Sequence, residues 1–488
     1  MITSLLLILL SLPVLTEPLK YETLQQKANQ VVEHSAMKHG RWGFYAVNST
    51  TGEIIIDIDG EKTLAPASNQ KLVTSAAALS LLGAETTVMT YLEYTGRIEE
   101  HILQGDLYIR GEGDPTLGSC YFDTTTCIDK VTAEWITAVT TLGIKEIRGN
   151  IIGDDCYFDH MPLPGAWSWT DIGNYYAPPT SGLSFHDNLY YLFFRPAGYV
   201  GGPAEVIKTE PEIPGLVFFN HMKTGAPGSG DNGFIYAAPW QHVHQLEGTI
   251  PAGLKEFSIK GSIPDPAQYT AHALKNALTQ NNITVAGDAL SIRNYSEKNH
   301  ESRNMFHTLS SPTIGEIIHI INKKSFNLYA EQILKLIGKK IEDEGSLDKG
   351  IEAIENWLEI KNISTDGIFI HDGSGLSVLD RLSAKFLVDL LIMMQAEPEF
   401  DVFYDSLPIA GDPDDIGTMS RLCRNTKAAY NLRAKTGSHV RIRSHSGYVR
   451  SRSGDIICFA MLANDYTGSS RIINKLHEQV MIQLAELP

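Results

Sequence analysis

The sequence is short of positive charge. It holds 40 Lys and Arg residues against 57 Asp and Glu residues, a formal net charge of −17 at pH 7. Phosphate backbones are held chiefly by Lys and Arg, so this balance argues against a general nucleic-acid-binding protein. Runs of like charge are short too, and the longest, residues 342–344, is typical of a solvated helix end. We therefore expect no nucleic-acid partner.

Cysteine is scarce, and its spacing matches no zinc site. The chain has five: Cys120, Cys127, Cys156, Cys423 and Cys458. Cys120 and Cys127 could close a small disulfide loop in an oxidising compartment, and the odd count leaves at least one cysteine free. A Gly-x-Gly-x-x-Gly pattern at 228–233 is not followed by a predicted helix, so it does not indicate a dinucleotide site. We expect no cofactor and no metal.

Long apolar runs are absent after the N-terminus. Residues 5–15 form a mostly apolar run with the length of a signal-peptide core, too short to cross a bilayer. No Lys or Arg precedes it and no Ala-x-Ala site follows, so we place a signal at 1–16 only by length. The alternative is a buried first helix. We expect export to the periplasm or another extracytoplasmic space, with no integral membrane segment after cleavage.

The chain has 488 residues, a length that predicts two to four domains. Strand patterns occur near both ends, at 42–47 and 54–58 and again at 434–438 and 456–463, whereas residues 314–394 contain four stretches that are helical in pattern. We interpret this as one α+β domain assembled from both ends of the chain, with a large insertion between them.

The first candidate chemical motif is Ser68-Asn-Gln-Lys71. Residues three apart share a helix face, so the hydroxyl and the amine can meet. Lysine acts as a base only when burial or a second cation lowers its pKa. The four-residue pattern also occurs at 35–38 and 346–349, but neither of these was expected to open an apolar helix. The alternative for Ser68 is an ordinary helix N-cap.

Two further motifs follow in the chain. Ser325-Phe-Asn327 can direct a hydroxyl and an amide into a cleft, with a decoy at 302–304 and a helix N-cap as its alternative. Lys435-Thr-Gly437 precedes Ser438 on a predicted strand, where Lys435 and Thr436 could bind a carboxylate and Gly437 could leave room for a substrate backbone. A second Lys-Thr-Gly at 223–225 is expected in a loop.

Order and context separate the motifs from their decoys, because only Ser68, Ser325 and Lys435 stand at a helix start, a helix and a late strand. Their separations are 257 and 110 residues. In these motifs and spacings the chain resembles the class C low-molecular-mass penicillin-binding proteins, the D-alanyl-D-alanine carboxypeptidase/endopeptidase family. The stretches 111–117, 149–154, 371–377 and 446–449 are also similar to that family.

The resemblance implies a penicillin-binding/β-lactamase-like transpeptidase fold, an antiparallel sheet flanked by helices, with two nested β-rich inserted domains. We place the peptidase domain at 17–87 and 305–488. The first inserted domain then covers 88–187 and 257–304, and the second covers 188–256. The implied partners are peptidoglycan stem peptides, with β-lactams as inhibitors.

The resemblance also implies roles for single residues. Ser68 would attack the carbonyl of the penultimate D-Ala and Lys71 would take its proton. Ser325 would pass a proton to the leaving nitrogen beside Lys435, and Asn327 would orient the peptide.

Four further residues would bind the substrate. Thr436 would hold the terminal carboxylate with Lys435, beside Gly437, and the N–H groups of Ser68 and Ser438 would form an oxyanion hole. Asp154 would contact the substrate amine, with Asp155 as a competing choice.

Some features depart from the family or leave alternatives open. An Arg commonly follows the Gly-Ser-Gly-Leu-Ser motif in relatives that bind diaminopimelate, but Val378 stands there and Arg381 comes three residues later. The aromatic residues at 167, 169, 175 and 176 could line the cleft or a glycan surface, although packing of an irregular loop is the favoured interpretation. A β-lactamase or esterase, and a non-catalytic wall-binding protein, are the alternative functions.

Overall fold

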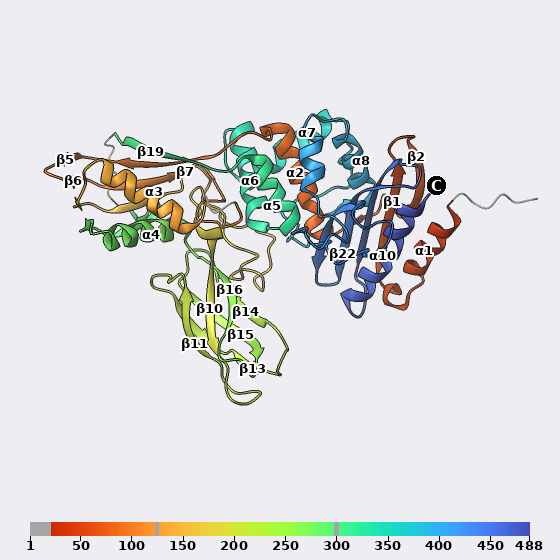
Figure 1. Cartoon of the computed structure of the whole chain (residues 1–488), viewed down its shortest axis with the longest axis horizontal. Helices are drawn as coiled ribbons and strands as arrows, with labels where there is room; N and C mark the ends of the chain where they lie inside the picture. Colours follow the sequence, from red (N-terminus) through yellow and green to blue (C-terminus); the bar gives the residue numbers. More distant parts are fainter. Residues whose placement is uncertain (1–20, 123–125, 297–301) are drawn as a thin grey trace, which may run out of the picture.

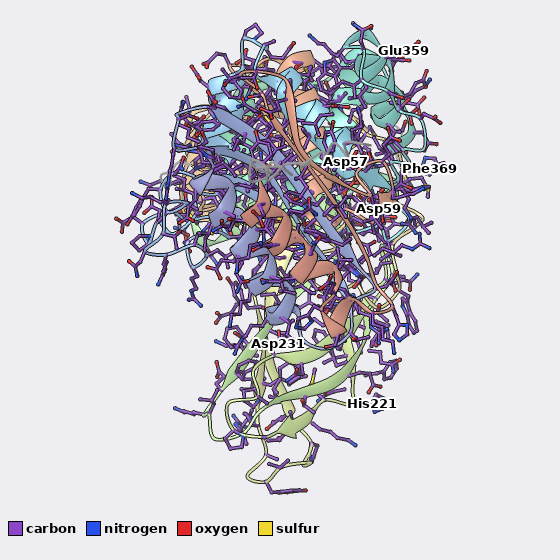
Figure 2. All side chains as sticks on the ribbon, turned by 90° about the vertical axis from the view of Figure 1, so that its right-hand side faces the viewer. Asp57, Asp59, His221, Asp231, Glu359 and Phe369 are labelled. Atoms are coloured by element: carbon purple, nitrogen blue, oxygen red, sulfur yellow. A yellow bond between two sulfur atoms is a disulfide. The ribbon has the colours of Figure 1, made fainter. Side chains whose placement is uncertain are left out.

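The computed structural model describes residues 21–122, 126–296 and 302–488, so the expected signal at 1–16 lies outside the described residues. Figure 1 shows a helical part with a sheet on the right, an elongated α/β part on the left, and a β lobe below their junction. Figure 2, turned to face the right-hand end, shows the lobe carrying His221 and Asp231 well below the rest. Over the described ranges, no helix is both long and apolar enough to cross a membrane.

The sheet of the right-hand part joins the two ends of the chain. It is antiparallel with the order β2-β1-β23-β22-β21. Its strands are β1 (Arg41–Asn48), β2 (Glu53–Ile58), β21 (Arg433–His439), β22 (Ile442–Arg450) and β23 (Ile456–Asn464). Nearly all of β23 is buried and apolar, as a strand must be when helices cover both faces of its sheet. The last strand, β21, is an edge strand.

Helices cover both faces of this sheet. On one face lie α1 (Glu22–Val32) and α10 (Ser470–Glu486). The other face is covered by α8 (Ala384–Met394), together with a layer of further helices. These are α2 (Gln70–Leu82), α5 (Ile314–Lys324), α6 (Asn327–Ile341), α7 (Leu347–Ile360) and α9 (Phe400–Ser406). Residues 70–79 of α2 are all buried, which is expected of a helix surrounded by others. A short ribbon pairs β3 (Thr63–Leu64) with β20 (Leu382–Ser383).

In its described residues, the left-hand part contains two sheets and two α-helices. One sheet has the order β18-β9-β7-β4-β19, with β4 (Met89–Tyr94), β7 (Leu107–Gly111), β9 (Ile151–Asp154), β18 (Ala289–Ser291) and β19 (Asn304–Ser310). The other has the order β17-β8-β6-β5, with β5 (Arg97–Glu99), β6 (Ile102–Gln104), β8 (Glu146–Ile147) and β17 (Thr284–Val285). The helices are α3 (Ile128–Thr141) and α4 (Pro266–Gln280). Strands from before and after the lobe therefore share one sheet.

The lobe consists of two small sheets. One has the order β11-β10-β16, with β10 (Leu189–Arg195), β11 (Glu205–Glu210) and β16 (Phe257–Ser262). The other contains β12 (Val217–Asn220), β13 (Lys223–Gly225), β14 (Asn232–Tyr236) and β15 (Val243–Pro251). The expectation that 223–225 is a loop was wrong, because these residues pair with β15.

The predicted fold class, with nested β-rich insertions, is confirmed, but two expected limits cut across hydrogen-bonded strands. A limit at 256/257 would separate β16 from β10, with which it pairs throughout. A limit at 304/305 falls inside β19, which pairs with β4. We propose limits after residues 262 and 310 instead, because they keep each sheet whole.

Candidate active site

Ser68 lies in a tight turn at the entrance to α2. The turn is the 3-10 segment Ala67–Asn69, and Ala67 has a φ of 46°, a left-handed conformation that is uncommon for a residue other than glycine. The Ser68 hydroxyl caps neither this segment nor α2, so the N-cap alternative does not hold. The decoy Ser346 does cap a helix: its Oγ accepts a hydrogen bond from the backbone N–H of Lys349 at 3.3 Å. The Ser68 hydroxyl instead faces a cavity.

The amine of Lys71 lies one turn further along and is completely buried. Its Nζ is 2.6 Å from Asn327 Oδ1, 2.6 Å from the Ser374 carbonyl oxygen and 3.2 Å from Ser68 Oγ. An ammonium has three hydrogens for these three oxygens. A neutral amine keeps two hydrogens for the two nearer acceptors and turns its lone pair to Ser68. The geometry thus directs the basic form of Lys71 at the serine proton.

Burial also favours that basic form. It lowers the pKa of Lys71 to about 8, while the nearby carboxylates of Asp372, Glu331 and Asp380 act in the opposite direction. Removing an ammonium from water disfavours its charge, which is why burial dominates. A substantial fraction of the Lys71 side chain is therefore neutral in mildly alkaline solution.

Ser325 and Asn327 lie at the junction of α5 and α6. Ser325 adopts a left-handed conformation with a φ of 59°, and the residue that caps α6 is Phe326, whose side chain accepts no capping hydrogen bond. The N-cap alternative for Ser325 therefore fails as well. The amide of Asn327 bridges two parts of the molecule, since Oδ1 accepts from Lys71 and Nδ2 donates to the Tyr176 carbonyl at 2.7 Å.

Lys435 reaches this junction from the edge strand β21. Its Nζ donates to Ser325 Oγ at 2.8 Å and to the Thr436 carbonyl oxygen at 2.9 Å, and its side chain is fully buried. Burial, and then the charge of Lys71, hold the pKa of Lys435 well below its usual range. Two buried amines thus lie behind two serine hydroxyls.

Gly437 of β21 lies in close contact with the turn that carries Ser68. A Cβ there would lie 2.0 Å from Ser444 Oγ, 2.6 Å from the Pro66 carbonyl oxygen and 3.2 Å from the Ser68 nitrogen. Gly437 does not line the cavity. Its missing side chain lets β21 pack against the turn that carries Ser68.

The two serine hydroxyls open into one cavity of about 760 Å³. Ser68, Ser325, Asn327, Thr436 and Ser438 contribute to its wall. Aromatic residues of the insertion and the lobe line it as well: Tyr175, Tyr176, Phe234 and Tyr236. The interpretation of the aromatic stretch as loop packing therefore fails for Tyr175 and Tyr176.

The structure does not place Asp154 in this cavity. Asp154 is buried in β9, and its Oδ2 accepts from Arg303 Nη1 at 2.6 Å, while the competing Asp155 bonds to Arg293 at 2.6 Å. Asp171 lines the cavity instead; the Tyr176 hydroxyl donates to its Oδ1 at 3.2 Å. Nothing in the sequence identified it, because it belongs to an irregular segment without periodicity.

None of the described residues that line the cavity near Val378 is an arginine. Val378 lines the cavity, whereas Arg381 does not; its Nη1 donates to the Val378 carbonyl oxygen at 2.6 Å. The carboxylate of Asp171 therefore lines the cavity without an arginine among the other described lining residues.

The inserted segment also supports the loop that holds Lys71. Trp167 Nε1 donates to Asp372 Oδ2 at 2.8 Å. The Asp372 carboxylate also accepts from the backbone N–H groups of Gly375 and Ser377, each at 2.6 Å, and of Ser374 at 3.1 Å. These bonds fix the Ser374 carbonyl that accepts from Lys71.

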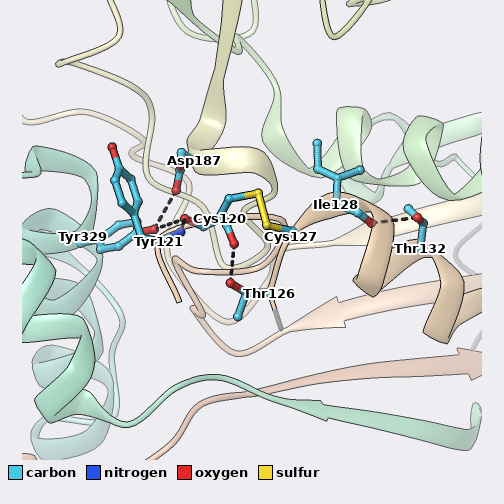
Figure 3. The surroundings of a disulfide bond; sticks show 9 residues. Cys120, Tyr121, Thr126, Cys127, Ile128, Thr132, Asp187 and Tyr329 are labelled. Carbon is cyan, nitrogen blue, oxygen red and sulfur yellow. Dashed lines mark hydrogen bonds between the residues drawn. A yellow bond between two sulfur atoms is a disulfide. The ribbon is translucent and has the colours of Figure 1, made fainter. Parts of the chain in front are cut away.

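A disulfide backs the Ser325–Asn327 turn from the other side. Cys120 and Cys127 are joined, as the sequence allowed, and Figure 3 shows Tyr329 of α6 beside this loop. The Tyr329 hydroxyl lies 2.8 Å from Ser119 Oγ and 2.7 Å from Asp187 Oδ1. The Tyr121 ring packs edge-on against that of Phe326, with centroids 5.6 Å apart.

Several known proteins are similar to this chain in sequence and in architecture. A D-alanyl-D-alanine carboxypeptidase from Actinomadura sp. (strain R39) is 29% identical over 472 residues, covering 95% of this chain and 84% of the relative. A D-alanyl-D-alanine carboxypeptidase from Haemophilus influenzae is 23% identical over 430 residues, covering 87% of this chain and 85% of the relative. The crystal structure of penicillin-binding protein 4 from Haemophilus influenzae matches with a TM-score of 0.79 at 20% identity, covering 96% of this chain and all of that one.

The similarity extends over both insertions and confirms the resemblance first seen in three short motifs. Residues 24–486 match the family described as D-Ala-D-Ala carboxypeptidase 3 (S13). Because this match includes the peptidase part, the left-hand part and the lobe together, the chain belongs to the D-Ala-D-Ala carboxypeptidase 3 (S13) family.

Proposed function

We propose that the protein is an exported serine D,D-peptidase that cleaves D-alanyl bonds of peptidoglycan, as carboxypeptidase, endopeptidase or both. The observation that carries the proposal is the Lys71 amine, which is buried, has a lowered pKa and is directed at the Ser68 hydroxyl by two shorter hydrogen bonds. Membership of the family supports the same reaction. We place the protein outside the cytoplasmic membrane, with residues 1–16 as its signal.

In the proposed acylation, Ser68 Oγ attacks the carbonyl carbon of the penultimate D-Ala while Lys71 accepts the hydroxyl proton. The peptide C–N bond then breaks and an ester to Ser68 forms. Ser325, hydrogen-bonded to Lys435, passes a proton to the leaving nitrogen, so D-Ala departs as an amine. Water hydrolyses the ester, which releases the shortened peptide and restores the serine hydroxyl.

Backbone donors would stabilise the charge that develops on the carbonyl oxygen. We assign this role to the N–H groups of Ser68 and Ser438, each contributing about 3 kcal/mol to the transition state. The close packing of Gly437 on the Ser68 turn supports the assignment, since it brings β21 against the nucleophile. Thr436, exposed to the cavity beside Lys435, would hold the terminal carboxylate of the substrate.

We propose that Asp171, not Asp154, receives the amine of the substrate's third side chain. Asp171 lines the cavity, where the Tyr176 hydroxyl donates to it and His439 Nε2 lies 3.9 Å from its Oδ2, whereas the charge of Asp154 is neutralised by Arg303. A carboxylate at the edge of a partly apolar cavity favours a cationic group over a neutral one.

β-Lactams would acylate Ser68 by presenting the same kind of bond. The Haemophilus influenzae penicillin-binding protein 4 has been solved in complex with a β-lactam, which supports this proposal. Slow release of the acyl group would distinguish a peptidase from the alternative β-lactamase, and uptake of labelled penicillin would exclude a non-catalytic wall-binding protein.

Mass spectrometry of purified muropeptides, before and after incubation with the protein, tests the reaction. We expect loss of one D-Ala, or opening of D-alanyl cross-links, with the natural protein and neither with Ser68→Ala. Equal cleavage by both proteins would contradict the proposed nucleophile. Ser346→Ala is a matched control, because this serine opens the same four-residue pattern but only caps α7.

A further inference from the structure

A row of aromatic and lysine side chains leads away from the active-site cavity across the lobe. Tyr175, Lys260, Tyr191, Phe193 and Lys208, here named the aromatic–lysine ladder, follow one another in contact. Lys260 Nζ lies 5.6 Å from the ring centroid of Tyr175 and 5.1 Å from that of Tyr191. The rings of Tyr191 and Phe193 are 6.5 Å apart, and Lys208 Nζ lies 4.9 Å from the Phe193 ring.

Strand register places the ladder on the outer face of one sheet. Tyr191 and Phe193 alternate along β10 with the buried residues Tyr190 and Leu192. In the neighbouring strands Tyr191 pairs with Lys260 of β16, and Phe193 pairs with Lys208 of β11. The side chains therefore form a continuous surface row, while the other side of β10 packs into the core.

The ladder begins inside the cavity. Tyr175 lines the cavity together with Ser68 and remains 42% exposed, and its backbone N–H donates to the Lys260 carbonyl oxygen at 3.3 Å. β10 runs from the junction of the three parts down into the lobe (Figure 1). A polymer lying on the ladder would therefore have its side branches delivered to the cavity.

The composition of the ladder is unusual for a surface of this acidic protein. Lys260 forms no ion pair with a carboxylate in the described ranges, although its charge acts on Asp187. Lys208, at the far end, pairs with Glu210, which lies opposite Tyr191 in β11. Lysine over aromatic rings presents flat apolar faces together with N–H donors, a combination that packing of the lobe itself does not require.

We propose that the aromatic–lysine ladder binds the glycan strand of peptidoglycan, so that a stem peptide attached to the strand enters the cavity at Tyr175. This inference rests on the proposed function. Sugar rings expose C–H faces that can stack on Tyr191 and Phe193, and their acetamido and hydroxyl oxygens can accept from the lysine N–H groups. Carboxylates of the stem peptides are complementary to the positive charge of Lys260.

The test measures co-sedimentation with purified, insoluble peptidoglycan, using Ser68→Ala protein so that the polymer stays intact. Tyr191→Ala and Lys260→Ala are each expected to weaken sedimentation about tenfold, which is the loss of one well-placed contact. The matched controls Phe219→Ala and Lys223→Ala change exposed residues on the other sheet of the lobe and should sediment like the parent. Equal sedimentation of all four variants would overturn the proposal.

Two further measurements identify the occupant. Glycan strands stripped of peptides should compete with the polymer more strongly than free stem peptides, which can occupy only the cavity end of the site; competition by the peptides alone would overturn the glycan assignment. With Ser68 intact, Tyr191→Ala should cleave a soluble N-acylated tripeptide ending in D-Ala-D-Ala as fast as the parent, and should digest the polymer about tenfold more slowly. An equal loss on both substrates would contradict a separate binding surface.

Sedimentation velocity excludes the remaining explanation. A change of oligomeric state in the ladder variants would show that a second copy of the chain covers this face, and would overturn the proposal. Failure of the proposed function has a different signature: the natural protein would take up no labelled penicillin, while binding of Ser68→Ala protein to the polymer would be unaffected.

Discussion

Lys71 Nζ and Asn327 Oδ1 lie 2.6 Å apart, closer than Lys71 lies to the serine it is proposed to deprotonate. Because an amide oxygen can only accept, this bond takes a hydrogen of the amine in either protonation state. The lone pair of the neutral amine is thereby directed away from Asn327 and toward Ser68. The amide thus orients the base.

Acylation of Ser68 is expected to rise with pH. The pKa of Lys71 is lowered by burial to about 8, and only the neutral amine can accept the serine proton. The rate of labelling by a fluorescent penicillin should therefore increase between pH 6 and pH 9, with its half-maximum near 8. A rate that falls as pH rises through this window would contradict Lys71 as the base.

Glu331→Gln is expected to move the rise of the penicillin-labelling rate to lower pH. Burial raises the pKa of Glu331 itself to about 8, so its carboxylate forms, and raises the pKa of Lys71, over the same pH range in which Lys71 loses its proton. Glu331 accepts from the Gly373 N–H at 3.0 Å, a bond that the glutamine oxygen can retain. Without the charge, Lys71 loses its proton more readily, so the half-maximal pH of penicillin labelling should fall. Glu352→Gln, at an exposed site on α7, should leave the profile unchanged. A loss of rate without a shift would indicate a purely structural role.

Asp171→Asn is expected to weaken recognition of a cationic third side chain. The kcat/KM for a peptide with a free amine at that position should fall about tenfold, since the cavity is partly open to solvent and screens the pair. The same peptide acetylated on that amine should be cleaved equally by both proteins. Asp154→Asn tests the earlier assignment, and a selective loss of kcat/KM for the free amine in that variant would restore it.

Removing the disulfide should destabilise the wall behind Ser325 and Asn327. Closing so short a loop lowers the entropy of the unfolded chain, and its loss should cost about 2 kcal/mol. Chemical denaturation of Cys120→Ser/Cys127→Ser measures this cost. Cys423→Ser changes a buried free cysteine and controls for the serine substitution itself. An unchanged denaturation midpoint in the double variant would show that the disulfide adds nothing to the bonds that Ser119 accepts from the Tyr329 and Thr126 hydroxyls.

The sequence predicted those parts of the site that depend on local periodicity. Ser68 and Lys71 are one helical turn apart, and Lys435, Thr436 and Ser438 follow a strand pattern. Decoys share these patterns, so the order of the motifs and the family resemblance were needed to select them. The long separation of the motifs indicated the insertions. The nested α+β architecture followed from the resemblance and is confirmed by the family match.

Other parts could not be predicted, because they arise from packing between distant segments. Asp171 belongs to an irregular segment, so no periodic pattern indicated that its side chain lines the cavity. The Ser374 and Tyr176 carbonyls act through the backbone, where residue identity gives no signal. Gly437 was identified by its motif, but the reason for glycine there is the contact with Pro66 and Ser444.

The Asn327 amide is hydrogen-bonded to Lys71 on one side and to the Tyr176 carbonyl on the other. The position of this amide therefore depends on docking of the inserted segment against the peptidase part. Its Nδ2 partner comes from a segment inserted between the two halves of the peptidase part. A partly folded chain, with its own serine and lysine in place but the insertion undocked, lacks one of the two restraints on the amide that orients the base. Full orientation of the base is thus reached only in the completed molecule.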